Sequence, residues 1–192
     1  SLEIPIIFSS TTNIFFNDFL GSYAESKILC EKILKKNNRK SLIIRVPLVV
    51  GKNSSSLNYI KNFYMKYSFL PLFGKQEGKT QPIHVSSLKE CIMDLVRESK
   101  YDGREINLIG EKTYNYRQIT TKFIDLGHKI FFIYIPLPFI FILAKFFELI
   151  NIPFLISCEE LMSLNKDKVL DKNKILNLKI VSNNEEILFK KS

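Results

Sequence analysis

Residues 4–11 read IPIIFSST, residues 22–37 read SYAESKILCEKILKKN, and residues 41–47 read SLIIRVP. The first and third stretches are short apolar runs typical of buried parallel strands, and the first one ends in polar residues. In the middle stretch, apolar and charged residues alternate at the period of an amphipathic helix. A strand, a helix and a second strand in this order form one crossover of a parallel sheet. These stretches therefore predict an α/β fold.

The remainder of the chain continues to switch between helical and extended patterns, without internal repeats or a low-complexity linker. The expected elements, in chain order, are a helix over 54–67, a turn-rich connector over 70–78, an extended piece over 82–85, a helix capped by Ser86 or Ser87 that runs to Val96, a strand over 105–109, a helix over 116–126, and short helical pieces with a strand-like element over 159–177.

The chain is basic, with 28 Lys and Arg against 19 Asp and Glu and a net charge of +9. Clustered cations would indicate a phosphate-rich partner. Here the cations are scattered, and no zinc-ligand spacing or nucleic-acid motif accompanies them, so we expect neither a nucleic-acid partner nor a metal site. Its 46% hydrophobic and 24% charged residues are those of an ordinary folded protein.

The three cysteines, Cys30, Cys91 and Cys158, are far apart in the sequence and lie in apolar surroundings. An odd number at such spacing predicts reduced, buried thiols rather than a disulfide framework. The first residues, Ser-Leu-Glu-Ile-Pro, lack the basic region and apolar core of a signal peptide. Both observations predict a cytoplasmic protein.

Residues 130–156 form a very apolar stretch, IFFIYIPLPFIFILAKFFELINIPFLI. A membrane-spanning helix needs about 20 uninterrupted apolar residues, whereas three prolines break this stretch and Lys145 and Glu148 lie inside it. We expect residues 139–150 to form a helix with an apolar face that contacts a partner or a membrane surface. A basic protein associated with the membrane surface therefore stays open as one alternative.

Tyr23 and Lys27 are four residues apart on the predicted helix over 22–37, so their side chains lie on one helix face. A nearby ammonium group favours the phenolate form of a tyrosine, which lets the phenol exchange a proton with a substrate hydroxyl. Thr11 ends the preceding strand, and open parallel sheets bind ligands at the carboxyl ends of their strands. Thr11 is therefore placed to hold the substrate oxygen.

The order of several short motifs resembles the extended short-chain dehydrogenase/reductases, in particular their NAD-dependent nucleotide-sugar epimerase/dehydratase branch. That family typically reads S-S-[ST], then Y-x-x-S-K-x-x-x-E, then I-x-R-P-x-x-V-x-G, then I-H-V-x-D-L. The corresponding residues here are 9–11, 23–31, 43–51 and 83–88. The segment over 160–169 also looks like the tail of bacterial members that are linked to surface-polysaccharide synthesis.

The resemblance implies an NAD- or NADP-dependent reaction at a sugar carbon. It makes Tyr23 the acid/base, Lys27 the residue that supports its ionisation and contacts the nicotinamide ribose, and Thr11 the residue that binds the reacting oxygen. It places Pro47 beside the nicotinamide, and it adds Ser9 and Ser10 to the cofactor-binding residues. Epimerisation, dehydration and reduction share this step, and the motifs do not separate them.

Three other residues are expected to be structural. Arg45 is expected to be an ion-pair partner inside the fold, Cys91 to belong to the core, and His84 to pack where a substrate lobe meets the sheet. No role is assigned to His128, which is the other histidine of the chain.

The chain also departs from the family. It contains only 7 glycines and no G-x-x-G-x-x-G turn, which in the family anchors the cofactor pyrophosphate at a helix N-terminus. The loop over 12–22 is short, and Thr80-Gln81 stands where the family has an arginine that meets substrate phosphate. We therefore expect the back part of such an enzyme, without its glycine-rich front half.

The resulting interpretation is the C-terminal part of a Rossmann-type parallel sheet with a small, mostly helical substrate lobe. We expect one partial NAD(P)-binding domain over 1–192, with lobe elements at about 52–82 and 111–192. The expected partners are a nucleotide-sugar substrate and either a missing N-terminal half or a second copy of the chain. A catalytically incomplete fragment that serves as a structural or assembly partner is the second alternative.

Overall fold

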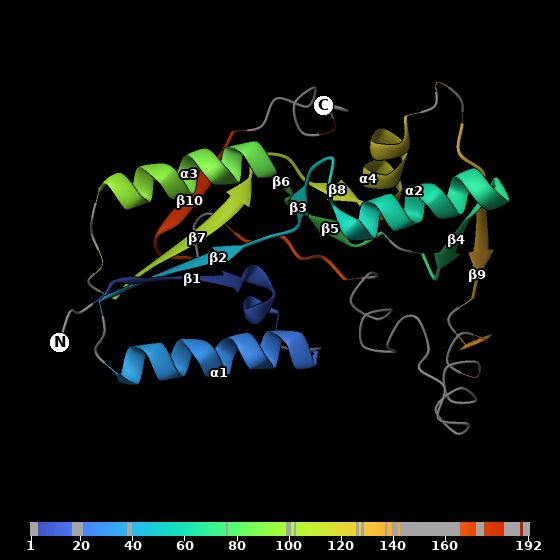
Figure 1. The fold of residues 1–192 in the computed structure, drawn as a ribbon. Coiled ribbons are helices and arrows are strands. Elements are labelled where there is room, and N and C mark those ends of the chain that lie inside the picture. The colour runs from blue at the N-terminus through green and yellow to red at the C-terminus, as the bar shows by residue number, and fades with distance from the viewer. Residues whose placement is uncertain are drawn as a thin grey trace. The chain divides into compact units, whose positions relative to one another are not determined.

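The computed structural model describes residues 4–16, 21–37, 40–75, 77–98, 101, 103–125, 127, 129–136, 138–139, 142, 166–171, 175–182 and 189. The chain divides into two compact units. Unit 1 comprises Ser1–Gly51, Thr80–Thr113 and Lys168–Ser192, and unit 2 comprises Lys52–Lys79 and Tyr114–Asp167. Figure 1 shows the elements of both units.

Unit 1 is built on a parallel sheet of four strands in the order β1-β2-β7-β10. The strands are β1 (Ile6–Thr11), β2 (Ser41–Val46), β7 (Arg104–Gly110) and β10 (Leu178–Val181). In the pairing of β1 with β2, Ile6 lies opposite Ser41 and Thr11 lies opposite Val46, so the two strands end at the same level. The parallel sheet expected from the sequence is thus confirmed.

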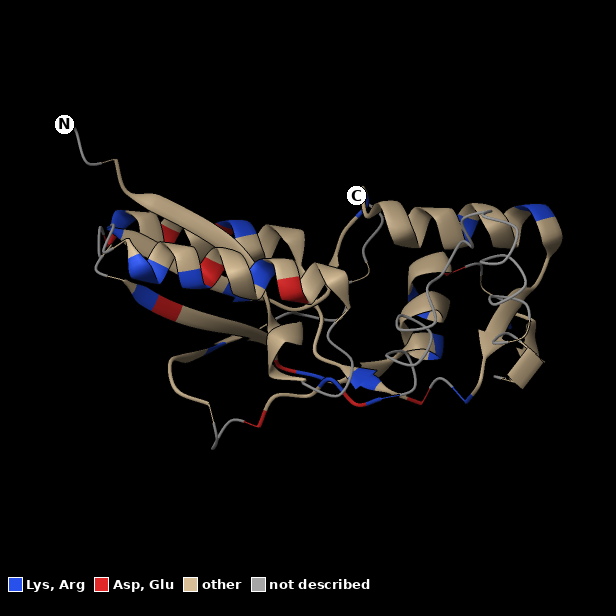
Figure 2. Ribbon diagram, turned by 90° about the horizontal axis from the view of Figure 1, so that it is seen from below, with Lys and Arg blue, Asp and Glu red and all other residues tan. Residues whose placement is uncertain are grey.

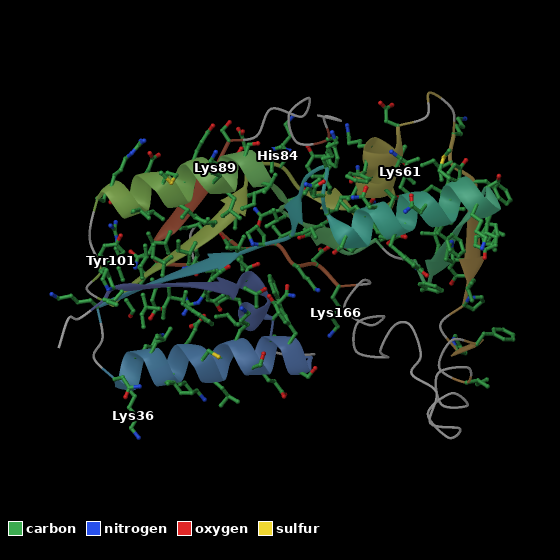
Figure 3. All side chains as sticks on the ribbon, viewed as in Figure 1. Lys36, Lys61, His84, Lys89, Tyr101 and Lys166 are labelled. Atoms are coloured by element: carbon green, nitrogen blue, oxygen red, sulfur yellow. The ribbon has the colours of Figure 1, made fainter. Side chains whose placement is uncertain are left out.

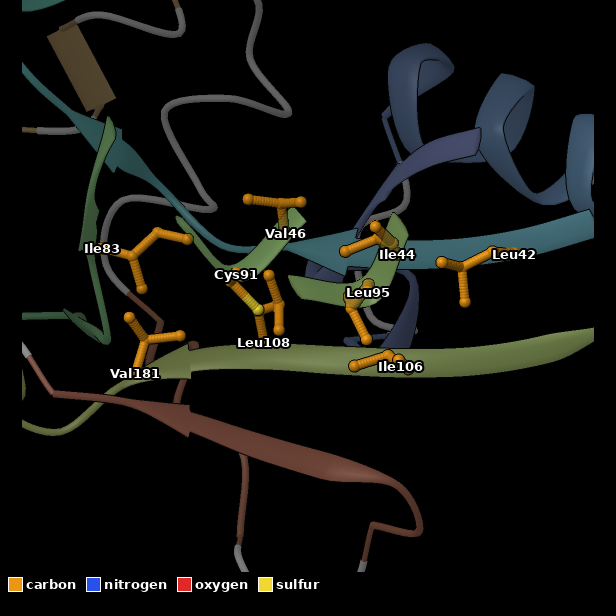
Figure 4. Packing of buried hydrophobic residues seen from close by; sticks show 9 residues of the cluster. All are labelled: Leu42, Ile44, Val46, Ile83, Cys91, Leu95, Ile106, Leu108 and Val181. Atoms are coloured by element: carbon orange, nitrogen blue, oxygen red, sulfur yellow. The ribbon is translucent and has the colours of Figure 1, made fainter. Parts of the chain in front are cut away.

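Helices α1 (Ser22–Lys36) and α3 (Val85–Arg97) cover opposite faces of this sheet (Figure 1). Alternate side chains of β2 point to opposite faces, as in any strand. Leu42, Ile44 and Val46 pack with Cys91 and Leu95 of α3 in the main core (Figure 4). The other members of that cluster are Ile83, Ile106, Leu108 and Val181. Cys91 is therefore a core residue, as expected.

Short elements connect the sheet strands of unit 1. They are the 3₁₀ helix η1 (Thr12–Phe15), β3 (Val49–Val50) and β6 (Ile83–His84), and β3 pairs with β6 in parallel. The prediction that Ser86 or Ser87 caps α3 is wrong: the cap is His84, whose Nδ1 accepts a hydrogen bond of 3.2 Å from the Ser86 N–H. An imidazole nitrogen thus takes the place of the expected hydroxyl.

The described part of unit 2 includes helices α2 and α4 and a parallel ribbon of β4 and β9. Its elements are α2 (Ser55–Tyr67), β4 (Leu70–Phe73), β8 (Tyr114–Asn115), α4 (Tyr116–Ile124) and β9 (Phe132–Ile135), and β5 (Lys79–Thr80) lies where the chain passes from unit 2 to unit 1. Tyr64, Leu70 and Ile124 form its buried cluster. A capping box between Asn115 and Gln118 begins α4.

Two expectations about the apolar and turn-rich segments need correction. Residues 70–73 form strand β4 rather than part of a connector, because Leu70 and Leu72 are buried and β4 pairs with the distant strand β9. Residues 168–192 group with unit 1 instead of the lobe, because β10 extends the parallel sheet beside β7.

The helix expected over 139–150 falls almost entirely outside the described residues, with only Phe139 and Ile142 described. In the ranges that the structure describes, no helix combines the length and the apolar character needed to cross a bilayer.

A buried ion-pair network joins α1 to the sheet. Arg45 of β2 donates two hydrogen bonds to the carboxylate of Glu31, at 2.9 Å from Nε and 2.6 Å from Nη2. It also bonds to Glu105 and to the side-chain oxygen of Asn107, both on β7. Lys35 of α1 pairs with Glu105 as well. The structural role expected for Arg45 is therefore confirmed.

The network shifts the ionisation of its own members. Burial alone would lower the pKa of the Arg45 guanidinium, but hydrogen bonds and charges from Glu31 and Glu105 outweigh it and raise that pKa. Partial burial would raise the pKa of Glu105, but the Lys35 hydrogen bond and the Arg45 charge lower it on balance. Both groups are thus held in their charged forms.

Replacing Glu31 with glutamine should lower the free energy of unfolding by about 3 kcal/mol, because the buried guanidinium loses its bidentate carboxylate. Urea denaturation followed by circular dichroism measures this change. The matched control is Glu98→Gln, which removes an exposed ion pair with Arg104 and should cost less than about 1 kcal/mol. Equal losses in the two variants would contradict the importance of the buried pair.

Candidate active site

The candidate site begins at the N-terminal turn of α1. Gly21 is the residue before the helix, and Tyr23 lies in the first turn with 60% of its surface exposed. The Ser26 hydroxyl donates a 2.7 Å hydrogen bond to the Tyr23 carbonyl oxygen. One turn later, the Lys27 ammonium lies 5.6 Å from the centre of the Tyr23 ring. The structure therefore brings Tyr23 and Lys27 together on one helix face.

Lys27 also connects α1 to strand β1. Its Nζ donates a 2.8 Å hydrogen bond to the Ser9 carbonyl oxygen and lies 4.9 Å from the centre of the Phe8 ring. In a parallel ladder only alternate residues bond to a given neighbour. Because the Ile6 N–H bonds to Lys40 on the β2 side, the backbone groups of Ser9 face the other edge of β1. Lys27 satisfies one carbonyl of that edge.

Ser10 and Thr11 lie at the carboxyl end of β1, and both side chains are buried. Thr11 Oγ1 accepts a 3.2 Å hydrogen bond from the Asn13 N–H and so caps η1. The Ser10 hydroxyl has no hydrogen-bond partner in the part of the chain that the structure describes. Thr11 lies opposite Val46, which Pro47 follows, so Pro47 belongs to the same end of the sheet.

The expected site residues thus form two groups along one sheet end. Tyr23, Lys27 and Ser9 are in mutual contact through the lysine. Ser10, Thr11 and Pro47 lie at the neighbouring strand ends, where the Thr11 hydroxyl is engaged in the cap of η1. The arrangement has an exposed phenol, an ammonium group and a buried hydroxyl near one another, which are groups able to exchange protons with and bind a hydroxylated ligand.

Sequence reasoning expected an ion pair for Arg45 but did not identify its partner, Glu31. Glu31 lies one turn after Lys27 on α1, and its pair with Arg45 fixes the helix against the sheet. The Arg45 guanidinium also lies 5.3 Å from the centre of the Phe15 ring of η1. A signal for the pair existed, because Arg45 is the one charge in an otherwise apolar strand sequence and Glu31 shares the helix face of Lys27.

The remaining titratable candidates have structural positions. His84 is buried beside the start of α3, where burial lowers its pKa and its Nδ1 caps the helix (Figure 3). His84 is therefore structural, as expected. His128 and Cys158 lie outside the described residues. The expectation that Cys30 is buried is wrong, because Cys30 lies on the solvent-facing side of α1. Among the described residues, no His, Cys, Asp and Glu gather into a metal-ligand group.

No family model matches the sequence, and no curated protein sequence matches it either. Solved structures do match its fold. UDP-glucuronic acid 4-epimerase from Bacillus cereus, in complex with NAD, matches over 85% of this chain with a TM-score of 0.59 and 14% identity. UDP-glucose 4-epimerase from Bifidobacterium longum, in complex with NAD+ and UDP, matches over 69% with a TM-score of 0.59 and 17% identity.

A third match is UDP-N-acetylglucosamine 4-epimerase from Methanobrevibacter ruminantium, over 69% of this chain with a TM-score of 0.54 and 20% identity. The chain covers 60%, 51% and 50% of the lengths of these three structures, respectively. Its fold is therefore that of part of the Rossmann-type nucleotide-sugar epimerases, which confirms the fold that the sequence motifs predicted.

Removal of the Ser10 hydroxyl and removal of the Thr11 hydroxyl should change the free energy of unfolding differently. Ser10→Ala should leave the free energy of unfolding unchanged or raise it by up to about 1 kcal/mol, because a buried hydroxyl without a partner disappears. Thr11→Val should lower it by about 1 kcal/mol, because the Asn13 N–H loses its acceptor. Thermal denaturation of both variants measures these changes. A loss of stability in Ser10→Ala larger than that in Thr11→Val would contradict the assignment.

Proposed function

We propose that unit 1 carries the reactive part of an NAD(P)-dependent site for a nucleotide-activated sugar, with Tyr23 as the acid/base. The observation that carries the proposal is the position of Lys27, which lies 5.6 Å from the exposed Tyr23 ring while it bonds to Ser9 at the strand edge. The solved structures of similar fold are named as epimerases of UDP-sugars, as dehydratases and as reductases. Their names support this substrate class.

The residues at this strand end fit the nicotinamide and ribose part of NAD or NADP. The buried Ser10 hydroxyl lacks a partner among the described residues and is available to a ligand oxygen or amide. Lys27 can donate to a ribose hydroxyl, and Pro47 is the residue proposed to line the nicotinamide. Bound NAD or NADP would supply the hydride chemistry of the reaction. Some of the similar structures are complexes with NAD or NADP.

The roles of the protein groups follow from their exposure and charge. The Tyr23 phenol is open to solvent and takes the proton of the sugar hydroxyl or returns it. The Lys27 ammonium lies 5.6 Å from the centre of the phenol ring and can donate to a hydroxyl of the ligand. Thr11 is proposed to hold the reacting oxygen, which requires its hydroxyl to donate to the sugar while Oγ1 still accepts from Asn13. Ser9 is proposed to line the cofactor through its backbone, since its carbonyl already bonds to Lys27.

Three finer points belong to this proposal. The reaction is one of epimerisation, dehydration or reduction, which share the same proton and hydride step. Unit 2 is proposed as the lobe that binds the sugar nucleotide. Surface-polysaccharide synthesis in the cytoplasm is the proposed setting, which rests on the resemblance of the segment over 160–169 and on the expectation of reduced cysteines.

Tyr23→Phe should lower turnover at least about a hundredfold in the natural protein that contains this sequence, because the phenol can no longer exchange a proton. NAD(P)H absorbance and product analysis over a panel of UDP- and dTDP-sugars measure the rate. Lys27→Met should lower turnover similarly, because the ammonium can no longer donate to the ligand. The controls are Tyr59→Phe and Lys32→Met, which remove the same groups from exposed helix positions. Near-normal turnover in Tyr23→Phe would refute the assignment.

A second candidate function is that of an assembly partner without activity of its own. It is favoured by the position of β1, which is an edge strand in the described sheet. An open strand edge pairs readily with a further strand. The chain also covers only about half of the similar structures.

The 192-residue chain by itself should bind NAD(H) with a dissociation constant no tighter than about 1 mM. The proposed contacts from Lys27 and Pro47 are few, the sequence has no glycine-rich turn to hold the pyrophosphate, and binding must first repay the lost freedom of the ligand. Isothermal titration calorimetry measures the constant, and Lys27→Met should remove any residual binding. Micromolar affinity in the wild-type chain would mean that the cofactor site is complete.

A further inference from the structure

An aromatic cluster lies where α2 ends and β4 begins. The Phe63 ring contacts the Tyr67 and Phe69 rings, with centroid distances of 4.7 Å and 5.6 Å. The backbone of Phe131 adjoins this cluster, because its carbonyl oxygen accepts a 2.9 Å hydrogen bond from the N–H of Leu70, and β4 pairs with β9 from Leu70 and Phe132 onward. We call these four residues, Phe63, Tyr67, Phe69 and Phe131, the aromatic tip of unit 2. Figure 3 shows the side chains around this end of α2.

The outer part of the aromatic tip is open to solvent although the core of unit 2 lies directly beneath it. Tyr67 is 49% exposed and Phe131 is 64% exposed, whereas the adjacent Tyr64 and Leu70 are buried. Met65, in the last turn of α2, is 60% exposed. Single exposed apolar side chains are ordinary, but large ones that lie side by side indicate a contact surface.

The surroundings of the aromatic tip are basic. The Lys66 ammonium lies 5.1 Å from the centre of the Tyr67 ring, and Lys129 is two residues before Phe131. Helices α2 and α4 contain no acidic residue (Figure 2). The described part of unit 2 has nine basic residues, Lys52, Lys61, Lys66, Lys75, Lys79, Arg117, Lys122, Lys129 and Lys166, against three acidic ones, Glu77, Asp125 and Asp167.

We propose that the aromatic tip of unit 2, with Lys66 and Lys129, binds the surface of an anionic lipid bilayer. Tyrosine and phenylalanine insert at the level of the lipid headgroups, and lysines beside them contact anionic headgroups while their stems stay along the apolar surface. Such interfacial binding needs no membrane-spanning helix, because buried apolar area and electrostatic attraction supply its energy together. The basic excess among the described residues of unit 2 matches an anionic surface.

The exposed aliphatic residues favour a lipid surface over a nucleic acid. Nucleic acids bind exposed aromatic rings by base stacking and basic groups by phosphate contacts. Met65 and Ile133 offer no stacking surface, and Ile133 lies on the same side of the strand as Phe131. Phe139 and Ile142, each 69% exposed, continue the apolar character of the segment. A bilayer accommodates all of these side chains, whereas a nucleic acid leaves the aliphatic ones without a partner.

Flotation of the 192-residue chain with large unilamellar vesicles tests the proposal. Vesicles of phosphatidylcholine alone should retain little protein, and vesicles that also contain phosphatidylglycerol should bind it, with binding that weakens as salt increases. The double variant Tyr67→Ser/Phe131→Ser should bind the anionic vesicles at least tenfold more weakly. The variant Lys66→Gln/Lys129→Gln should lose most of the dependence on phosphatidylglycerol.

Matched controls come from α1 in unit 1. Leu29→Ser/Ile33→Ser removes apolar side chains of similar exposure, and Lys32→Gln/Lys36→Gln removes exposed charges. Both controls should bind the vesicles as the wild-type chain does. Circular dichroism and the thermal midpoint verify that each variant is folded, and a folded single variant, Phe131→Ser, replaces the double variant if the latter unfolds.

Several outcomes would overturn the proposal. They are absence of binding to anionic vesicles, equal binding by the Tyr67→Ser/Phe131→Ser variant, and displacement of the chain from vesicles by single-stranded DNA. A fourth outcome concerns the chain without vesicles. If the wild-type chain sediments as a dimer and the Tyr67→Ser/Phe131→Ser variant sediments as a monomer, a second copy of the chain covers the aromatic tip instead of a bilayer. The assay contains neither NAD(P) nor sugar, so its result is independent of the proposed catalytic function.

Discussion

The buried ion pair between Arg45 and Glu31 is the interaction on which the arrangement of unit 1 depends. The pair places the guanidinium of β2 against α1. Two nitrogens of Arg45 donate hydrogen bonds to the two carboxylate oxygens of Glu31. A bidentate pair fixes direction as well as distance. Glu31 is one helical turn after Lys27, so the pair of Glu31 with Arg45 also brings Lys27 to the edge of β1. Tyr23 is one turn before Lys27 and therefore lies on the same helix face.

The Lys27 bond to Ser9 links the candidate site to the pairing state of β1. In the described sheet β1 has a strand neighbour on one side only, and the lysine satisfies a carbonyl that faces the other side. A strand that paired with this edge would donate its own N–H to the same carbonyl oxygen, which has two lone pairs. The Ser9 carbonyl therefore connects the outer edge of β1 with Lys27 of α1.

Local periodicity was sufficient to predict α1, α2 and β2, since each has a clear helical or apolar pattern. The order of motifs was sufficient to predict the Rossmann-type fold. The ribbon of β4 and β9 was missed, because Pro71 and Gly74 indicate turns and the pairing partner is distant in sequence. The contact of Lys27 with Ser9 was also unpredictable, since it depends on which edge of β1 is covered.

In the described part of unit 2, large apolar side chains stay exposed beside the buried cluster. Its buried cluster needs one face of α2, one face of α4 and one face of the ribbon, which Tyr64, Ile124 and Leu70 supply. Exposure of Phe131 and Tyr67 leaves unused the free energy that burial of their rings would contribute. The lysines that flank them show that the surface is not simply hydrophobic. A boundary that is apolar on one side and anionic on the other satisfies both features, and a lipid headgroup region is such a boundary.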